Sequence, residues 1–226
     1  MPDLPPIKAR QYASDASCYA ELHCLSNFSF LRGASHPEEL VYHAHSLGYD
    51  ALAITDECSL AGIVRAHVAA KEVGLKLIVG VEIQLSDGPR LLALAKNKQA
   101  YAEISALVTC GHYELFRDDV VNLICSASII WLPHKHIEFD QQHLSQSFYA
   151  RDQAEVKWLS KHFSKQCWLG LEQFYVGGER THMERLSNLA DEYSLPIVAC
   201  GDVHMHCRER HALADTLAAI RLTKPL

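Results

Sequence analysis

The most constraining feature of this sequence of 226 residues is a repeated alternation of short apolar runs with segments of helical period. Most runs are apolar at nearly every position, as is typical of strands covered on both faces. Strands are expected at residues 19–25, 51–56, 76–83, 90–95, 122–127, 167–172 and 196–202. Because helical segments separate most of them, the pattern predicts a parallel sheet.

The segments between the runs carry helix signals. The first helix is expected to have Ser35 as its N-cap, with Pro37 in the first turn and Glu38 three residues after the cap, and to end at Gly48. Further helices are expected at residues 61–73, 100–109, 152–163 and 179–193, and an amphipathic helix precedes residues 225–226. In residues 111–150 the positions of helices and strands are unclear from the sequence pattern.

About seven strands favour closure into a barrel over an open sheet. We therefore predict an α/β fold, a (β/α)7 barrel of mostly parallel strands with outer helices. Residues 1–17 are polar and contain prolines, which predicts an N-terminal arm, and residues 18–226 are expected to form the folded domain.

Composition narrows the function classes. Lys and Arg number 21 against 27 Asp and Glu, a formal net charge of -6, so no general basic surface is expected to hold a nucleic-acid backbone. No apolar run reaches the eighteen or so residues needed to span a bilayer. The eight cysteines form no C-x-x-C pair and the chain begins without a secretory leader, which favours a reduced cytoplasmic protein.

Polar side chains recur where the expected strands end. In a parallel barrel these ends share one rim, so we expect the side chains to meet there. Imidazoles and carboxylates form a ligand set suited to zinc, manganese or iron, which can activate water against a phosphoester. The residues concerned are His23, Asp56, Glu57, Glu82, Glu172, Asp202 and His204.

Each of these residues also has a structural interpretation. Asp202 and His204, two apart on an extended segment, would share a face and could bind one ion, but Asp202 could equally be a turn residue. His23 could be a hydrogen-bonded core histidine. Glu82 lies in a buried strand, where a carboxylate needs an ion or a cationic partner. For Glu172, pairing with Lys or Arg is as reasonable as ligation.

Other catalytic classes find little support. Cys24 directly follows His23, and adjacent strand residues point to opposite faces, so they cannot act as nucleophile and base. Neither a Walker loop nor a dinucleotide fingerprint is present. Fourteen histidines invite a metal hypothesis, but their number alone is a weak signal.

Four segments in series resemble a known family. Residues 21–40, 52–62, 75–83 and 199–206 are similar to the motifs of the PHP (polymerase and histidinol phosphatase) domain. Their order and spacing most closely resemble the version at the N-terminus of bacterial C-family DNA polymerases. Residues 30–40 and 215–226 are similar to its error-prone branch. The resemblance covers residues 19–226.

The resemblance implies a distorted barrel whose rim, in intact family members, holds up to three metal ions for phosphoester hydrolysis. His23 falls on the first histidine of the H-x-H motif, and Glu82, Asp202 and His204 fall on later ligand positions. Glu57 replaces a family histidine and could still ligate through oxygen. These five residues are the expected metal site, with room for one divalent ion, zinc or manganese.

Two departures from the family pattern imply that this site is degenerate. Leu25 replaces the second histidine of H-x-H and cannot ligate a metal. Arg32 replaces a following ligand, where its charge repels a cation and offers a partner to Glu82 or Asp202.

The function implied is that of the N-terminal PHP domain, as a fragment, of an error-prone DNA-directed DNA polymerase in DNA repair and translesion synthesis. Its partners would be the downstream polymerase domains, DNA through the full-length protein, and other damage-tolerance proteins. The alternatives are a stand-alone metal-dependent phosphoesterase and a non-catalytic scaffold.

Overall fold

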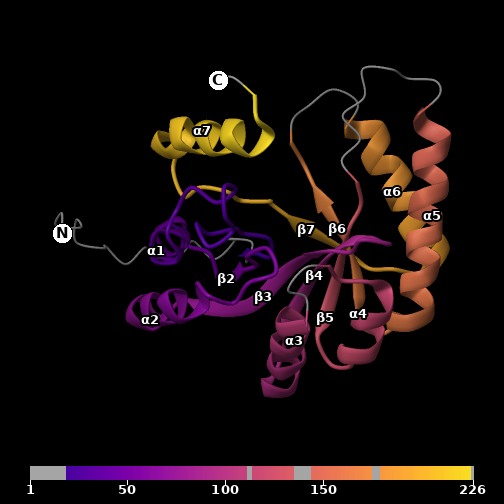
Figure 1. Cartoon of the computed structure of the whole chain (residues 1–226), viewed down its shortest axis with the longest axis horizontal. Helices are drawn as coiled ribbons and strands as arrows, with labels where there is room; N and C mark the ends of the chain where they lie inside the picture. The colour runs from indigo at the N-terminus through magenta and orange to yellow at the C-terminus, as the bar shows by residue number, and fades with distance from the viewer. Residues whose placement is uncertain (1–18, 111–113, 135–143, 175–178, 225–226) are drawn as a thin grey trace, which may run out of the picture.

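Seven strands form one sheet whose spatial order follows the chain, β1 to β7, in the computed structural model (Figure 1). The structure describes residues 19–110, 114–134, 144–174 and 179–224; the expected arm at residues 1–17 lies outside them. The strands are β1 (Ala20–Glu21), β2 (Ala51–Ile54), β3 (Lys76–Gln84), β4 (Arg90–Ala95), β5 (Ser128–Leu132), β6 (Cys167–Glu172) and β7 (Ile197–Cys200). Four of the six pairings are parallel, as predicted.

Strand β4 runs against its neighbours, which simple β/α alternation does not predict. It pairs antiparallel with both β3 and β5, and Gln84 lies opposite Arg90. Only residues 85–89 connect β3 to β4, which is too short for a crossover helix and contains the turn-forming pair Asp87-Gly88. The first residue of β4, Arg90, therefore lies at the same rim as the last residues of β3.

The two ends of the sheet approach each other just past β1 and β7. Cys24 and Val203 form an isolated parallel bridge, with Val203 N–H donating to the His23 carbonyl. The buried Glu21 carboxylate accepts from the N–H groups of His23 and Gly201. A Cβ atom on Gly201 would overlap the Glu21 carboxylate, so a larger residue would push this carboxylate away from the N–H groups that it accepts from. The result is a nearly closed mixed barrel, the distorted seven-strand fold that was predicted.

The helices lie outside the sheet, with α1 and α2 on one side of the view and α5 and α6 on the other (Figure 1). They are α1 (Pro37–Leu47), α2 (Ile63–Val73), α3 (Lys98–Cys110), α4 (Arg117–Leu123), α5 (Leu144–Phe163), α6 (Glu179–Tyr193) and α7 (His211–Leu222), with a short 3₁₀ turn, η1 (Arg208–Arg210). None of those described is long and apolar enough to cross a membrane.

Strand β4 shows how the core is layered. Leu91 and Ala93 point toward the outer helices, whereas Leu92 and Leu94 belong to a smaller cluster inside the barrel. This alternation explains why the run is apolar throughout: both faces are covered. Helix α7 differs from the six other α-helices, because it buries none of its residues although eight of its twelve are apolar.

Several local predictions were wrong. The strand expected at residues 19–25 is limited to β1, and the helix expected at residues 152–163 begins at Leu144. The strand expected at residues 122–127 lies instead at β5, because α4 continues to Leu123 and the backbone N–H groups of residues 125–127 donate to the Glu103 carboxylate. The N-cap of α1 is His36 rather than Ser35, and the capping glutamate is Glu39, whose carboxylate accepts from the His36 N–H.

Candidate functional site

The loop at residues 26–33 is fixed to the barrel by one buried carboxylate. Asp56, just past β2, accepts hydrogen bonds from Ser26 N–H, Ser26 Oγ and Ser29 Oγ, each at 2.7 Å. Burial raises the pKa of Asp56, although the bonds from Ser26 and Ser29 oppose the rise. Asp56 is thus a structural residue that secures the loop carrying Arg32.

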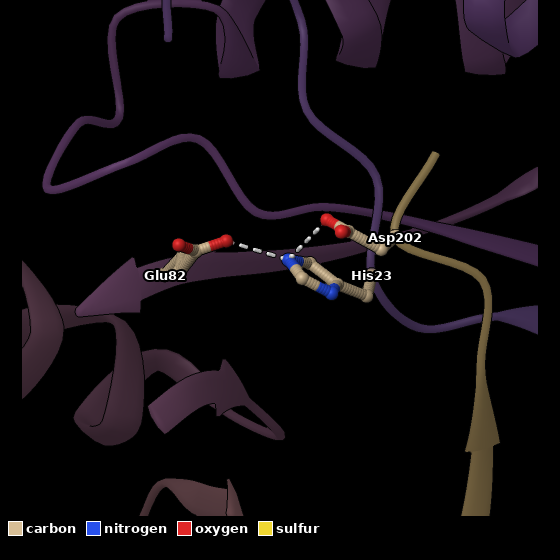
Figure 2. A group of neighbouring side chains, drawn as sticks. All are labelled: His23, Glu82 and Asp202. Carbon is tan, nitrogen blue, oxygen red and sulfur yellow. Dashed lines mark hydrogen bonds and ion pairs between the residues drawn. The ribbon is translucent and has the colours of Figure 1, made fainter. Parts of the chain in front are cut away.

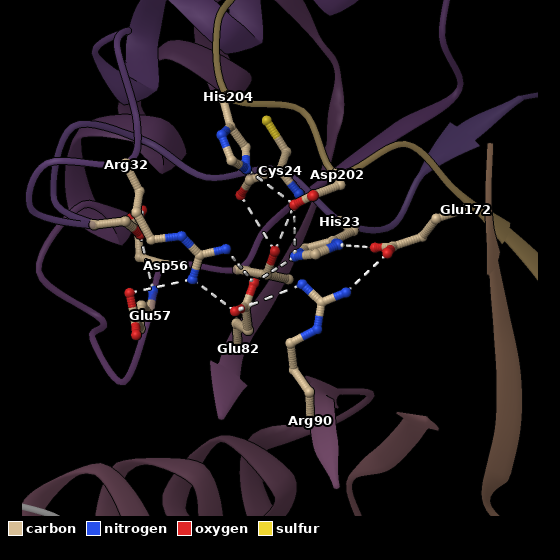
Figure 3. Close-up of polar contacts among 12 residues, drawn as sticks. His23, Cys24, Arg32, Asp56, Glu57, Glu82, Arg90, Glu172, Asp202 and His204 are labelled. Carbon is tan, nitrogen blue, oxygen red and sulfur yellow. Dashed lines mark hydrogen bonds and ion pairs between the residues drawn. The ribbon is translucent and has the colours of Figure 1, made fainter. Parts of the chain in front are cut away.

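His23 occupies the centre of the rim and is fully buried. Its Nε2 lies 2.7 Å from Glu82 Oε2 and its Nδ1 lies 2.7 Å from Glu172 Oε1 (Figure 3). Burial alone would lower the pKa of His23, but the hydrogen bonds to Glu172 and Glu82 and the charge of Asp202 outweigh it and raise the pKa to about 9. The imidazole is therefore held as a cation between carboxylates.

Two arginines complete the network. Arg32 bonds both oxygens of Glu82, at 2.6 and 3.2 Å, and lies 3.1 Å from Glu57. Arg90 lies 2.8 Å from Glu172 and 4.0 Å from Glu82, so that His23, Glu82, Arg90 and Glu172 form a ring of alternating charge (Figure 3). Burial would raise the pKa of Glu82, but bonds from His23 and Arg32 lower it to about 2.

Three of the five expected metal ligands come together. One donor atom each from His23, Glu82 and Asp202 lies within 4.8 Å of the others, and His23 Nε2 faces both carboxylates (Figure 2). The distance from His23 Nε2 to Asp202 Oδ1 is 3.6 Å. These three side chains, referred to below as the triad, could hold one metal ion.

The other two expected ligands lie outside the triad. Glu57 has a side chain 45% exposed and contacts Arg32 instead. His204 bonds Asp202 at 3.0 Å, so these two side chains do converge. They do not converge through extended backbone, however, because Asp202 has a φ of 48° in the left-handed region.

In the arrangement described, the side chains of the rim bond one another. Both Glu82 oxygens already accept bonds from Arg32. The orphaned buried atom at the described rim is the Arg32 Nε, a donor, which calls for an acceptor rather than for a cation. In the described rim, three cations also nearly balance the charge of the four carboxylates that they contact. The cations are Arg32, Arg90 and His23, and the carboxylates are Glu57, Glu82, Glu172 and Asp202.

Arg32 was expected to pair with Glu82 or Asp202, and the structure pairs it with Glu82. Of the two interpretations of Glu172, pairing with Lys or Arg and metal ligation, the structure shows pairing, with Arg90. Arg90 was missed, because a uniform β/α pattern places the start of a strand at the opposite rim. The signal that could have located it is the turn at residues 86–89, which contains Asp87-Gly88 and favours a hairpin.

Comparison with solved structures shows the fold. The chain matches a protein from Bifidobacterium adolescentis assigned as a metal-dependent phosphoesterase, with a TM-score of 0.57, 18% identity, and coverage of 84% of this chain and 88% of that one. An amidohydrolase from Chromobacterium violaceum matches with a TM-score of 0.55, 14% identity, and coverage of 88% and 96%.

Comparison with curated proteins shows closer relatives. The chain is 47% identical to the error-prone DNA polymerase of Methylococcus capsulatus over 221 residues, 94% of this chain. It is 46% identical to that of Pseudomonas aeruginosa over 217 residues, 93% of this chain. It spans about 20% of the length of either relative. The family model of the PHP domain matches residues 21–199. With this match over most of its length, and with a nearly closed barrel carrying His23, Glu82 and Asp202 at one rim, the chain belongs to the PHP domain family.

Proposed function

We propose that the chain is the N-terminal PHP domain of an error-prone DNA polymerase, which acts in the cytoplasm in translesion synthesis and DNA repair, and that its rim is structural rather than hydrolytic. The similarity to two such polymerases supports the first part. The observation that carries the second is the pair of bonds from Arg32 to both oxygens of Glu82.

The chemistry of phosphoester hydrolysis explains why this contact matters. A metal centre in such a site polarises the phosphoryl group and lowers the pKa of a bound water. To hold the metal ion that produces these two effects, the site needs carboxylate lone pairs that are free to bind it and a negative charge that nearby cations do not compensate. Arg32 and His23 together bond the Glu82 oxygens three times, out of about four lone-pair sites that a carboxylate offers, and the alternating ring around His23 compensates the charge.

The partners follow from this assignment. The net charge of -6 leaves DNA to be bound by other parts of the polymerase. The domain would contact those parts and, through them, other damage-tolerance proteins. Nucleotide addition would belong to the remaining four fifths of a polymerase of the relatives' length.

The second candidate function is that of a stand-alone metal-dependent phosphoesterase, favoured by the proximity of His23, Glu82 and Asp202. In that case one zinc or manganese ion would be held by the triad, with Glu57 and His204 at its margin. This candidate requires Arg32 to leave Glu82 when the ion binds.

Metal analysis separates the two candidates. The purified chain, dialysed against zinc or manganese, is expected to retain far less than one equivalent, to hydrolyse no aryl phosphate, and to show the same unfolding midpoint with and without EDTA. One bound equivalent together with turnover that Asp202→Asn abolishes would favour the phosphoesterase.

The polymerase assignment has its own test. The product of the complete reading frame is expected to extend a primer past an abasic site, whereas the 226-residue chain extends none. A reading frame that ends at Leu226 would contradict it.

A further inference from the structure

Arg32 is held at the rim more firmly than a surface arginine would be. Its side chain is only 10% exposed and contacts two carboxylates, those of Glu82 and Glu57. Its loop is fixed by the bonds from Ser26 and Ser29 to Asp56. Because breaking a buried ion pair costs several kcal/mol, the guanidinium stays in place unless a stronger ligand displaces it.

Two members of the triad, His23 and Asp202, are spaced like the ligands of one metal ion. Two ligands of one zinc ion lie about 3.4 Å apart when each is about 2.1 Å from the metal, and His23 Nε2 lies 3.6 Å from Asp202 Oδ1. The other ring nitrogen, Nδ1, is bonded to Glu172, the arrangement that orients a metal-binding histidine. Asp202 Oδ1 is bonded to His204, itself an expected ligand. Glu82, in contrast, is drawn to 2.7 Å from His23 Nε2 while Arg32 bonds both its oxygens.

We infer that Arg32 is a resident cation that keeps the triad of His23, Glu82 and Asp202 closed to metal ions, and that neutralising this one guanidinium opens a site for a single divalent ion. The inference rests on the proposed structural rim, and it attributes the exclusion of metal ions from this rim to one side chain. It also distinguishes the two arginines. Arg90 bonds Glu172, on the far side of the imidazole, and lies 4.0 Å from Glu82, so its removal leaves the Glu82 oxygens occupied.

The test compares cobalt binding by variants of the full chain. Co²⁺ is the probe, because its visible absorption reports coordination directly, and equilibrium dialysis gives the stoichiometry. Arg32→Gln is expected to bind one equivalent with an affinity about 100-fold above that of the unchanged chain, the scale on which groups around a metal site alter affinity. Its unfolding midpoint should rise when Co²⁺ is added.

Three control variants define the cause. Arg32→Lys keeps the charge and Arg90→Gln removes the other rim arginine, so both are expected to bind as weakly as the unchanged chain. The double variant Arg32→Gln/Asp202→Asn is expected to lose the gained site. Equal gains in Arg32→Gln and Arg90→Gln would overturn the inference, because any loss of positive charge would then suffice.

Failure of the inference and failure of the proposed function give different results. If neither the unchanged chain nor folded Arg32→Gln binds Co²⁺, Arg32 does not close the site, but the structural rim stands. If the unchanged chain binds one equivalent, the structural rim itself is wrong. Arg32→Met, which keeps an apolar stem and carries no charge, is a second variant in case Arg32→Gln does not fold. If neither variant folds with Co²⁺ present, the inference is overturned, because an opened site would add its binding free energy to folding.

Discussion

Two buried carboxylates in this barrel, Asp56 and Glu21, act as acceptors for groups that would otherwise lack partners. Asp56 accepts three bonds from Ser26 and Ser29, and Glu21 accepts from the backbone on both sides of the barrel seam. A buried donor without a partner costs about 1–3 kcal/mol. Loss of either carboxylate would therefore leave more than one donor unpaired at once.

Asp56→Ala is expected to lower the free energy of unfolding by about 3 kcal/mol, since it strands one N–H and two hydroxyl groups. Urea denaturation of the purified chain measures the change. Asp50→Ala is the matched control, because Asp50 is exposed, and it should change stability by less than about 0.5 kcal/mol. Similar losses in the two variants would show that Asp56 does not fix the loop.

Among the elements, α3 is joined to the turn before β5 by a single side chain. The Glu103 carboxylate accepts from the N–H groups of Cys125, Ser126 and Ala127 and from Ser126 Oγ. Burial alone would raise the pKa of Glu103, but these bonds lower it to about 2. This contact fixes the backbone of residues 125–127, directly before β5 begins at Ser128.

The lowered pKa gives this contact a defined pH dependence. A carboxyl group whose pKa falls on folding stabilises the native state above its unfolded pKa, and that contribution is lost as pH falls through the folded pKa. Glu103→Gln should therefore cost about 2 kcal/mol at pH 7 and progressively less from about pH 4.5 down to about pH 2. Stability curves for this variant and for the exposed control Glu184→Gln measure it. A difference from the unchanged chain that stays constant with pH would contradict the prediction.

Elements with a complete local signal were predicted well. The bounds of β4, β6 and α6 match those expected, because an apolar run or a helical period fills each of them. The strand at residues 122–127 was misplaced because nothing local shows that Glu103, some twenty residues earlier, captures those N–H groups. At the site, His23, Glu82 and Asp202 were predicted to meet, whereas Arg90 depends on the strand direction set by the turn at residues 86–89.

Over the whole molecule, stability is unevenly distributed. The barrel and α1 to α6 share large buried clusters, but α7 buries no residue, and Leu213 and Ile220 are 41% and 58% exposed. The segment leading to α7 is tied to α1 by polar contacts, from Ser35 to His206 and from Glu39 to Arg210. The barrel should therefore owe little of its stability to the apolar side chains of this helix.

The double variant Leu213→Ser/Ile220→Ser tests this distribution. We expect its free energy of unfolding to differ from that of the unchanged chain by only about 1 kcal/mol, since both side chains are exposed and belong to none of the buried clusters. Leu107→Ala in α3, where the side chain is fully buried, should cost about 2–5 kcal/mol in the same measurement. A large loss in the double variant would show that α7 belongs to the cooperative core.

The reversed direction of β4 has a consequence for how such a rim can change over evolution. A strand entered through a crossover helix delivers its first residue to the distant mouth of the barrel, whereas a hairpin delivers it to the near one. The five residues between β3 and β4 thus decide whether a guanidinium at position 90 can reach Glu172. A short connection between two strands can therefore place a second guanidinium at this rim, beside Arg32 from the loop after β1.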